Sequence, residues 1–348
     1  MDKVEIKRIK NILKDKATSI VIVSHVNPDG DAVGSSLGLF HYLRNAGYKK
    51  VNVISPNAFP EFLSWMPGSE KIILANQQSK IASELLKNAA VLFCLDFNDM
   101  ERTDDLSARL KKSTATKILI DHHPDPQPGF HIVLSQVTAS STAELMYEFF
   151  EALQGVEYID KTVAECLYAG IITDTGSFSF ACNNPRTYHI TAILIALGVD
   201  GEKIHRLIYD TYSEDRMRLL GYCLSEKLKV LKEHKTSYIW LSANDLQRFN
   251  FKEGDTEGVV NYGLSIKGIA LTAIFIERKD NIKISLRSEG QVNVNVLARK
   301  YFNGGGHKNA AGGNHKDTLE NTLTYFENLL EQISADNFKA LDEIAEND

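Results

Sequence analysis

Residues 19–31 read SIVIVSHVNPDGD, and this stretch decides the fold class. Its first half, Ser19 to Ser24, is an apolar run without a polar face, as is typical of a strand that is covered on both sides. A helical pattern follows, with Leu37, Phe40 and Leu43 at helical spacing. A buried strand that leads into a helix is the repeating unit of an α/β protein with a mostly parallel sheet.

The same alternation continues along the chain. Further short apolar runs predict strands at Val51–Ile54, Val91–Leu95, Lys117–Ile120 and Ala169–Ile172. Helical patterns separate them, so helices are expected on both faces of the sheet. We therefore predict a first domain at residues 1–195.

The pattern changes after this domain. Residues 196–232 are expected to form a helical linker, and residues 233–348 a second, smaller α/β domain. Its predicted strands include Tyr238–Leu241, Ile269–Ile276 and Ile282–Arg287. The last of these alternates polar and apolar residues, so Lys283, Ser285 and Arg287 should share one face.

Composition and charge limit the classes of function. The chain has 348 residues, of which 43% are hydrophobic and 24% are charged, as in an ordinary globular protein of about two domains. The net charge of −6 argues against long or duplex nucleic acid as a partner, because such binding normally needs a strongly basic face. A small anionic substrate held by a local cluster of positive groups remains compatible with it.

Cysteine usage and hydropathy indicate the compartment. The four cysteines form no C-x-x-C pair, so a disulfide framework is not expected. Residues 1–16 predict an amphipathic helix and not a signal peptide. No apolar stretch approaches the roughly 20 residues of a membrane span. We expect a cytoplasmic protein without a membrane partner.

Acidic residues and histidines stand where the predicted strands end. They are His25, Asp29, Asp31, Asp96, Asp121, His122, His123 and Asp174. Asp96 or Asp174 alone is better explained as a turn or helix N-cap residue. Pro28-Asp29-Gly30-Asp31 alone could form only a turn, and Asp121-His122-His123 alone could be a satisfied loop pair. Together, even four of these five carboxylates in one crevice would repel each other unless cations lay among them, and two divalent ions would balance four aspartates. Mixed histidine and aspartate ligands suit Mn²⁺, with Mg²⁺ or Co²⁺ as alternatives, and a pair of such ions is the usual device for attack on phosphorus.

A glycine run marks the second domain. Gly304, Gly305 and Gly306 would let backbone N–H groups approach a phosphate, and His307 follows them. Arg287 can grip a phosphate with two N–H bonds. A flexible turn is the simpler explanation for a lone glycine run, but a substrate clamp is favoured beside a dinuclear site. Lys308 is a weaker candidate, and Tyr262 is better explained as a core aromatic than as a base-stacking residue.

The ordered motifs resemble those of a known family. His25-x-x-x-Asp29-x-Asp31, then Asp96, Asp121-His122-His123 and Asp174, resemble the four motifs of the DHH phosphoesterases, and the Gly304–Gly313 stretch resembles the signature of the DHHA1 domain. The resemblance covers nearly the whole chain. It is strongest to the family branch of bifunctional oligoribonucleases and 3′-phosphoadenosine 5′-phosphate phosphatases. The longer exonucleases of the superfamily carry an additional nucleic-acid-binding domain for which this chain has no room.

The resemblance implies a role for each residue. One metal ion would be held by His25, Asp29 and Asp96, and the other by Asp31, Asp96, His122 and Asp174, with Asp96 bridging. His123 would act on the leaving oxygen as hydrogen-bond donor or general acid. Arg287, Gly304, Gly305, Gly306 and His307 would bind substrate, and the active site would lie in the cleft between the two domains. Arg102 resembles a recurrent arginine of the family, although a salt bridge within the domain explains it equally well.

Three hypotheses for function follow. The first is a manganese-dependent phosphoesterase that hydrolyses very short single-stranded RNA to mononucleotides and removes the 3′-phosphate of phosphoadenosine phosphate. The second is a phosphodiesterase for cyclic or linear signalling dinucleotides. The third is a nucleotide sensor without turnover, which the full ligand set disfavours. Cleavage direction, base preference, native metal and oligomeric state stay open, with a homodimer as one option.

Overall fold

The computed structural model describes residues 1–332, and the chain divides into two compact units between Thr211 and Tyr212. The division falls inside the predicted linker at residues 196–232. Helix α8 (Gly201–Tyr209) packs on the first unit, and helix α9 (Glu214–Glu226) packs on the second. Each of these two helices therefore belongs to the core of one unit.

The first unit is built on six parallel strands in the order β3-β2-β1-β4-β5-β6. Their bounds are β1 (Ile20–Val23), β2 (Val51–Ser55), β3 (Ile73–Leu74), β4 (Val91–Leu95), β5 (Thr116–Asp121) and β6 (Ile132–Ser135). The parallel sheet predicted from the sequence is confirmed. Strands β3 and β6 were not predicted.

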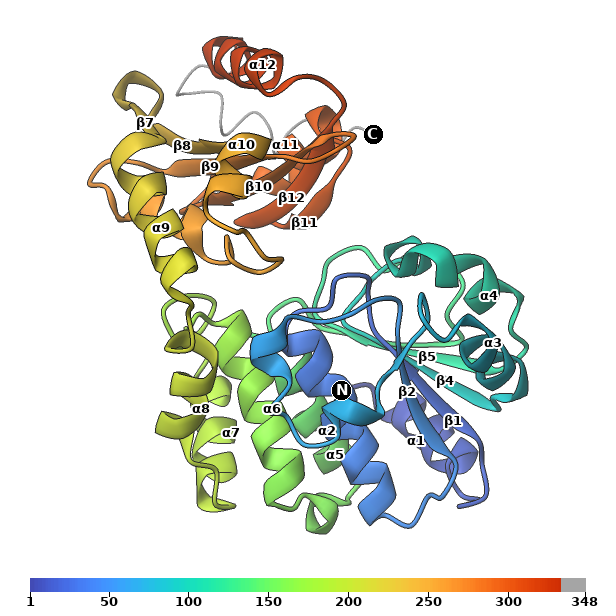
Figure 1. Ribbon diagram of the computed structural model, residues 1–348. Helices are drawn as coiled ribbons and strands as arrows, with labels where there is room; N and C mark the ends of the chain where they lie inside the picture. Colours follow the sequence, from blue (N-terminus) through green and yellow to red (C-terminus); the bar gives the residue numbers. More distant parts are fainter. Residues whose placement is uncertain (333–348) are drawn as a thin grey trace. The chain divides into compact units, whose positions relative to one another are not determined.

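Helices cover both faces of this sheet, as Figure 1 shows for α3 and α4 on one side and α2, α5 and α6 on the other. Ile20 and Ile22 of β1 contribute to one hydrophobic core, and Val21 and Val23 contribute to the other. A strand with two buried faces needs an uninterrupted apolar sequence. The helices are α1 (Lys3–Ile12), α2 (Gly30–Asn45), α3 (Ser79–Asn88), α4 (Ser107–Lys112), α5 (Thr142–Ala152), α6 (Lys161–Asp174) and α7 (Pro185–Ala196).

One predicted strand was wrong. Residues Ala169–Ile172 lie in the last turns of α6. At the amino-terminal end of this helix, Asp160 acts as the cap by accepting a hydrogen bond from the backbone N–H of Val163. All residues from Ala169 to Ile172 are buried. A helix that is buried on every side shows no polar face, so a short apolar window in it cannot be distinguished from a buried strand. Asp174 therefore stands at the end of a helix and not at the end of a strand.

Helices α2 and α6 pack at very short distance. A Cβ added to Gly34 would lie 2.5 Å from the carbonyl oxygen of Cys166 and 2.9 Å from the backbone nitrogen of Gly170. One turn earlier, a Cβ on Gly30 would lie 2.4 Å from the side chain of Thr173. The amino-terminal end of α2 therefore lies beside the carboxyl-terminal end of α6. This packing brings Asp31 and Asp174 to the same end of the two helices.

The second unit is built on a mixed sheet in the order β11-β12-β10-β9-β8-β7, in which only β8 and β9 are parallel neighbours. Its strands are β7 (Leu228–Leu231), β8 (Thr236–Leu241), β9 (Leu271–Glu277), β10 (Ile282–Ser288), β11 (Gly305–His307) and β12 (Ala310–His315). Its further helices are α10 (Ala243–Arg248), α11 (Val294–Tyr301) and α12 (Leu319–Gln332). The second α/β unit predicted from the sequence is confirmed.

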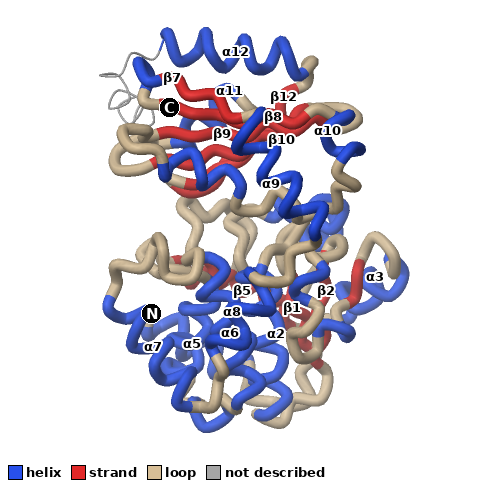
Figure 2. The backbone as a smooth tube through the Cα atoms, turned by 60° about the vertical axis from the view of Figure 1, so that its left-hand side comes forward, coloured by secondary structure: helices blue, strands red, loops and turns tan. Residues whose placement is uncertain are grey.

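Each face of this second sheet has its own core. Helices α11 and α12 cover one face, and α9 and α10 cover the other, with α12 and α9 on opposite sides in Figure 2. Along β10, the apolar residues are buried, while Lys283, Ser285 and Arg287 are partly exposed, as the alternation predicted. Within residues 1–332, no helix combines the length and the apolar character that a membrane span requires.

Candidate functional site

The acidic and histidine motifs of the first unit meet at the carboxyl end of its sheet. His25 lies in the loop between β1 and α2, and Asp29 caps α2 by accepting hydrogen bonds from the backbone N–H groups of Asp31 and Ala32, both at 3.0 Å. Asp29 thus caps a helix and also belongs to the cluster. Asp96 follows β4 with a φ of +64°. Non-glycine residues seldom adopt this conformation, and it is concentrated at functional sites.

The first group of potential ligands consists of His25, Asp29 and Asp96. The Nε2 atom of His25 lies 3.5 Å from Oδ2 of Asp96 and 4.0 Å from Oδ1 of Asp29. Its Nδ1 atom lies 2.8 Å from the carbonyl oxygen of Val26, which can only accept a hydrogen bond. The proton of the neutral ring therefore sits on Nδ1, and Nε2 presents its lone pair to the carboxylates.

The second group gathers around His122. Its Nε2 atom lies 3.3 Å from Oδ2 of Asp174, 3.6 Å from Oδ1 of Asp96 and 3.9 Å from Oδ2 of Asp31. Asp31, Asp96 and His122 are all buried. Asp96 thus belongs to both groups, with Oδ2 facing His25 and Oδ1 facing His122.

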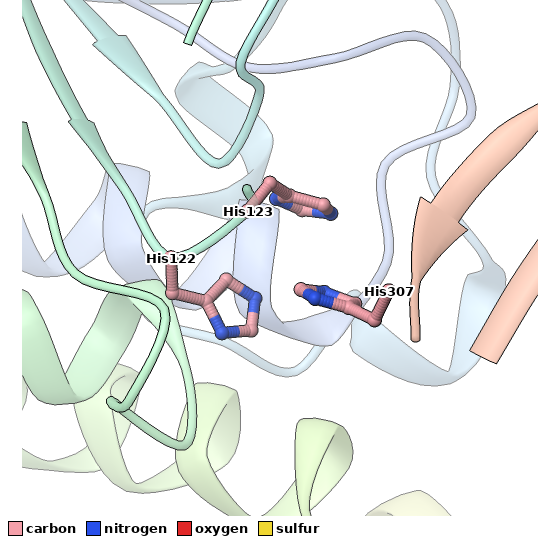
Figure 3. A group of neighbouring side chains, drawn as sticks. All are labelled: His122, His123 and His307. Carbon is pink, nitrogen blue, oxygen red and sulfur yellow. The ribbon is translucent and has the colours of Figure 1, made fainter. Parts of the chain in front are cut away.

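His123 has a different surrounding from His122, although the two rings are only 5.0 Å apart (Figure 3). Its Nδ1 atom lies 2.8 Å from Oδ1 of Asp121, the last residue of β5. Asp121 is fully buried and accepts this hydrogen bond at the base of the cluster. The pair is a carboxylate–imidazole dyad, which fixes the ring orientation of His123. The sequence contained Asp121 within its motif, but no role was assigned to it.

The charges of the cluster are strongly coupled. Burial raises the pKa of Asp31 well above its ordinary range, and the negative charges of Asp96 and Asp174 raise it further. Burial and the charge of Asp96 raise the pKa of Asp121 to about 7. Burial alone would lower the pKa of His122, but the charges of Asp174 and Asp96 outweigh it and raise that pKa. Burial alone would raise the pKa of Asp96 as well, but its hydrogen bond to His25 and the charges of His123 and His122 outweigh burial and lower it. The raised pKa values of Asp31 and Asp121 show the mutual repulsion of the crowded carboxylates, which divalent cations would relieve.

Helix α5 supports two of these carboxylates. The backbone N–H groups of Thr142 and Ala143 donate to Oδ2 and Oδ1 of Asp31 at 2.6 and 2.8 Å, and the hydroxyl of Thr142 donates to Oδ1 of Asp96 at 2.9 Å. The first N–H groups of a helix are natural partners of an anion. Ser141 caps this helix by accepting a hydrogen bond from the backbone N–H of Glu144. Thr142 was missed because its partner Asp96 is 46 residues distant in the sequence.

In the second unit, the predicted substrate residues lie on neighbouring strands of one sheet. Arg287 belongs to β10, and residues 305–307 form β11, which pairs with β12. A Cβ on Gly304 would lie 1.9 Å from the carbonyl oxygen of Gly312, so glycine is needed there for packing within the unit. A Cβ on Gly305 would meet nothing closer than 3.7 Å. Of these two glycines, only Gly305 has the open surface that approach to a phosphate requires.

Three secondary interpretations can be compared with the structure. Tyr262 is 47% exposed, so its interpretation as a core aromatic was wrong. Lys308 donates to the side chain of Gln291 at 2.7 Å. Among the residues that the structure describes, Arg102 forms no salt bridge. Its positive charge instead opposes the rise in the pKa of His25 and of Asp121, which indicates that it lies near the cluster.

The sheet, the buried histidine–aspartate cluster and the glycine-bearing second unit together define a metal-binding phosphoesterase. Residues 19–171 match the model of the DHH family N-terminal domain, and residues 235–336 match the DHHA1 domain. The chain therefore belongs to the DHH/DHHA1 family of phosphoesterases, as the motifs predicted.

Three comparisons describe its relatives. The chain is 30% identical over 297 residues to the bifunctional oligoribonuclease and PAP phosphatase NrnA of Bacillus subtilis (strain 168), covering 84% of this chain and 88% of the relative. It is 27% identical over 312 residues to the cyclic-di-AMP phosphodiesterase PdeA of Listeria monocytogenes, covering 87% of this chain but 45% of the relative. It also resembles the crystal structure of an exopolyphosphatase-related protein from Bacteroides fragilis, with a TM-score of 0.91, 43% identity and 98% coverage of both chains.

Proposed function

We propose that this phosphoesterase uses Mn²⁺ to hydrolyse very short oligoribonucleotides to mononucleotides and to remove the 3′-phosphate of phosphoadenosine phosphate. The observation that carries the proposal is the position of Asp96, whose two carboxylate oxygens face two different groups of potential ligands. Two ions that share one carboxylate are suited to in-line displacement at phosphorus. The substrate class is supported by the similarity to NrnA over both domains.

The donor set fits two divalent ions. Ligand bonds of about 2.1 Å place two donor atoms on one octahedral ion about 3.0 to 4.2 Å apart. The distances from His122 Nε2 to its three carboxylate neighbours, 3.3 to 3.9 Å, fall in this interval, as do those from His25 Nε2 at 3.5 and 4.0 Å. We assign His25, Asp29 and Asp96 to one ion. We assign Asp31, Asp96, His122 and Asp174 to the other.

The residues of the cluster that are not assigned to an ion, His123 and Asp121, act on the leaving group. When bound, the two ions supply an activated water and neutralise phosphate charge. His123 donates a hydrogen bond or a proton to the leaving oxygen. Its Nδ1–H is held by Asp121, so the negative charge of Asp121 stabilises the positive ring that a general acid needs. Arg102 adds positive charge near the cluster, which favours an anionic phosphate there.

The second unit supplies groups for another phosphate. Arg287 can donate two N–H bonds to one phosphate group, and His307 can add a further donor. Gly305 leaves its backbone open to a close approach. Both proposed substrate types, a phosphorylated dinucleotide and phosphoadenosine phosphate, carry two phosphate groups, which matches a metal cluster combined with a separate clamp.

A second candidate function is hydrolysis of signalling dinucleotides such as c-di-AMP, pApA or pGpG. The similarity to PdeA favours it, although this chain spans less than half of that relative. The chemistry at phosphorus is the same in both candidates, so the metal ligands do not distinguish them. Substrate length and cyclisation do.

A turnover panel tests the two candidates. With Mn²⁺ present, kcat/KM is measured for RNA of two to five nucleotides, longer RNA, phosphoadenosine phosphate, c-di-AMP, pApA, pGpG and polyphosphate, with Asp96→Asn as the inactive control. We expect the highest values for short RNA and phosphoadenosine phosphate and a steep fall with RNA length, because a protein of net charge −6 offers little attraction to a long polyanion. Preference for cyclic dinucleotides would reject the proposal in favour of the second candidate. Preference for polyphosphate would reject both candidates.

A further inference from the structure

The loop that follows Asp174, a member of the cluster, holds an exposed aromatic ring. Phe180 is 46% exposed and comes six residues after Asp174. Its backbone N–H donates to the carbonyl oxygen of Thr175 at 3.1 Å, so the chain returns to the residue next to Asp174. Single exposed apolar residues are common on protein surfaces. What distinguishes Phe180 is how it is held.

The backbone of this loop is strained. Ser177, Phe178 and Ala181 have φ angles of +55°, +64° and +50°. Residues with a Cβ rarely adopt this conformation, and bulky ones least of all. Such conformations persist only where surrounding contacts impose them, and they are concentrated at binding and catalytic segments.

Those contacts are present in the last turn of α6. The N–H of Ser177 donates to the carbonyl oxygen of Ile172 at 2.7 Å, and the N–H of Ser179 donates to that of Thr175 at 2.8 Å. The hydroxyl oxygen of Thr175, a fully buried residue, accepts from the N–H of Phe178 at 3.1 Å. The loop is thus attached rigidly to the helix end that carries Asp174.

The ring of Phe180 has one defined position. It packs on Gly176, where an added Cβ would lie only 2.2 Å from Cε1 of the ring. Gly176 also has a φ of +53°, a conformation that favours glycine. The ring contact and the backbone angle therefore both favour glycine at this position. The hydrogen bonds therefore hold the backbone of the loop, and the apolar ring packs on Gly176 with nearly half of its surface in water.

We propose that Phe180 is a stacking platform for the nucleobase of the nucleotide whose phosphate binds at the histidine–aspartate cluster. The inference rests on the proposed function, because only a nucleotide substrate carries a base that is linked through one sugar to that phosphate. A pre-oriented, uncharged aromatic ring suits a flat base, and ordering it on binding costs little entropy. Every base has a π-face, so the platform selects for a base without selecting strongly among the bases.

The test compares Phe180→Leu with wild type on three substrates. These are 5′-phosphorylated diadenylate and two analogues, each of which lacks one of the two adenines. Leucine keeps an apolar contact with Gly176 but has no flat face, so it separates stacking from packing. Tyr158→Leu is the matched control. Tyr158 is also partly exposed, but it contacts Tyr42 near the far end of α2, about 16 Å along that helix from Asp31.

We expect Phe180→Leu to lower kcat/KM on diadenylate about 5- to 150-fold. The loss should disappear on the analogue that lacks the stacked base, Phe180→Trp should keep wild-type turnover, and Tyr158→Leu should change nothing. An equal loss on all three substrates, or no loss on diadenylate, would overturn the platform. A changed sedimentation coefficient without substrate selectivity would also overturn it, since the ring would then serve self-association.

A binding measurement separates this inference from the proposed function. Diadenylate with 2-aminopurine in place of either base should lose fluorescence on binding to wild type and lose less on binding to Phe180→Leu. If wild type hydrolysed no dinucleotide, the proposed function would fail, and this quenching would still decide the platform. Equal quenching by both proteins would reject it.

Discussion

The two units present their candidate residues in opposite ways. In the first unit, Asp31, Asp96 and His122 are 1%, 2% and 5% exposed, and each has a partner atom within 4 Å. In the second unit, Arg287 and His307 are only partly buried on strands of an otherwise well-packed sheet. Buried, crowded charges need counter-ions, so replacing one of them should have a large effect on the site. Half-exposed hydrogen-bond donors remain solvated without a ligand, so replacing one of them should weaken substrate binding only in part. The first unit should therefore decide whether chemistry occurs, and the second should decide how well a given substrate is held.

The largest effect expected from this comparison is that of Asp96→Asn. Removing the shared carboxylate charge should abolish Mn²⁺-dependent hydrolysis, with a loss on the order of 10³-fold or more. Without metal, the variant should be less stable than wild type: burial alone would raise the pKa of Asp96, but His25, His123 and His122 outweigh it and lower that pKa, and the substitution removes this net attraction. Activity, bound metal and thermal melting with and without Mn²⁺ would be measured.

Asp105→Asn is the control, since Asp105 is an exposed acid of the same unit. It should keep wild-type activity and the wild-type increase in Tm on addition of Mn²⁺. Substantial turnover by Asp96→Asn would remove Asp96 from the bridging position.

The paired histidines provide the next test. His122→Ala should lose bound metal, because His122 Nε2 faces three carboxylates. His123→Ala should keep its metal and lose about 10²- to 10⁴-fold in kcat, because its ring is held by Asp121 and serves the leaving group. Metal content by elemental analysis and kcat on phosphoadenosine phosphate distinguish the two. Loss of a metal equivalent in His123→Ala would mean that the two roles are exchanged.

Much of this site could be predicted from the sequence because its motifs are local. His25, Asp96 and Asp121 each come within two residues of the end of a buried strand, and parallel strands deliver such residues to one edge. Asp174 lies at the same edge, but it stands at the end of a helix that was predicted as a strand. The signal that explains its position is the spacing Gly30, Gly34, Gly38 on α2, where glycine allows α6 to pack at short distance. That pattern is visible in the sequence, but the helix it packs against is not.

The contribution of Thr142 could not be predicted in the same way. Its sequence context indicates a helix start, and the structure confirms one. Its hydrogen bond to Asp96 depends on how α5 is placed relative to β4, which local spacing does not encode. The predicted linker at residues 196–232 contains helices of both units for a related reason, since α8 and α9 both have a helical sequence pattern and are separated only by the cores they join.

Arg287→Ala should have a graded effect in the second unit. It removes a charge-assisted, two-pronged contact worth roughly 1.5–3 kcal/mol, or about 10- to 150-fold in kcat/KM. The loss should be large for phosphoadenosine phosphate or a 5′-phosphorylated dinucleotide and small for an artificial ester with one phosphate. Lys283→Ala is the control on the same face of β10, where its ammonium faces Glu253 at 3.6 Å. Equal losses on both substrate types would show that Arg287 supports the chemistry or the fold and not a separate clamp.

The smallest effect, and the sharpest comparison within the second unit, comes from adding one methyl group to Gly306 or to Gly305. At Gly306, φ is +148° and a Cβ would lie 2.5 Å from the carbonyl oxygen of Ala310, so Gly306→Ala should disturb the pairing of β11 with β12 and lower stability by about 1–3 kcal/mol. At Gly305 the nearest atom would be 3.7 Å away, so Gly305→Ala should leave urea-induced unfolding unchanged. If a phosphate approaches the backbone at Gly305, the added methyl group should still raise KM for substrates with two phosphates. Unchanged stability together with unchanged KM in Gly305→Ala would assign the glycine run to strand packing alone, and the clamp would then depend on Arg287 and His307.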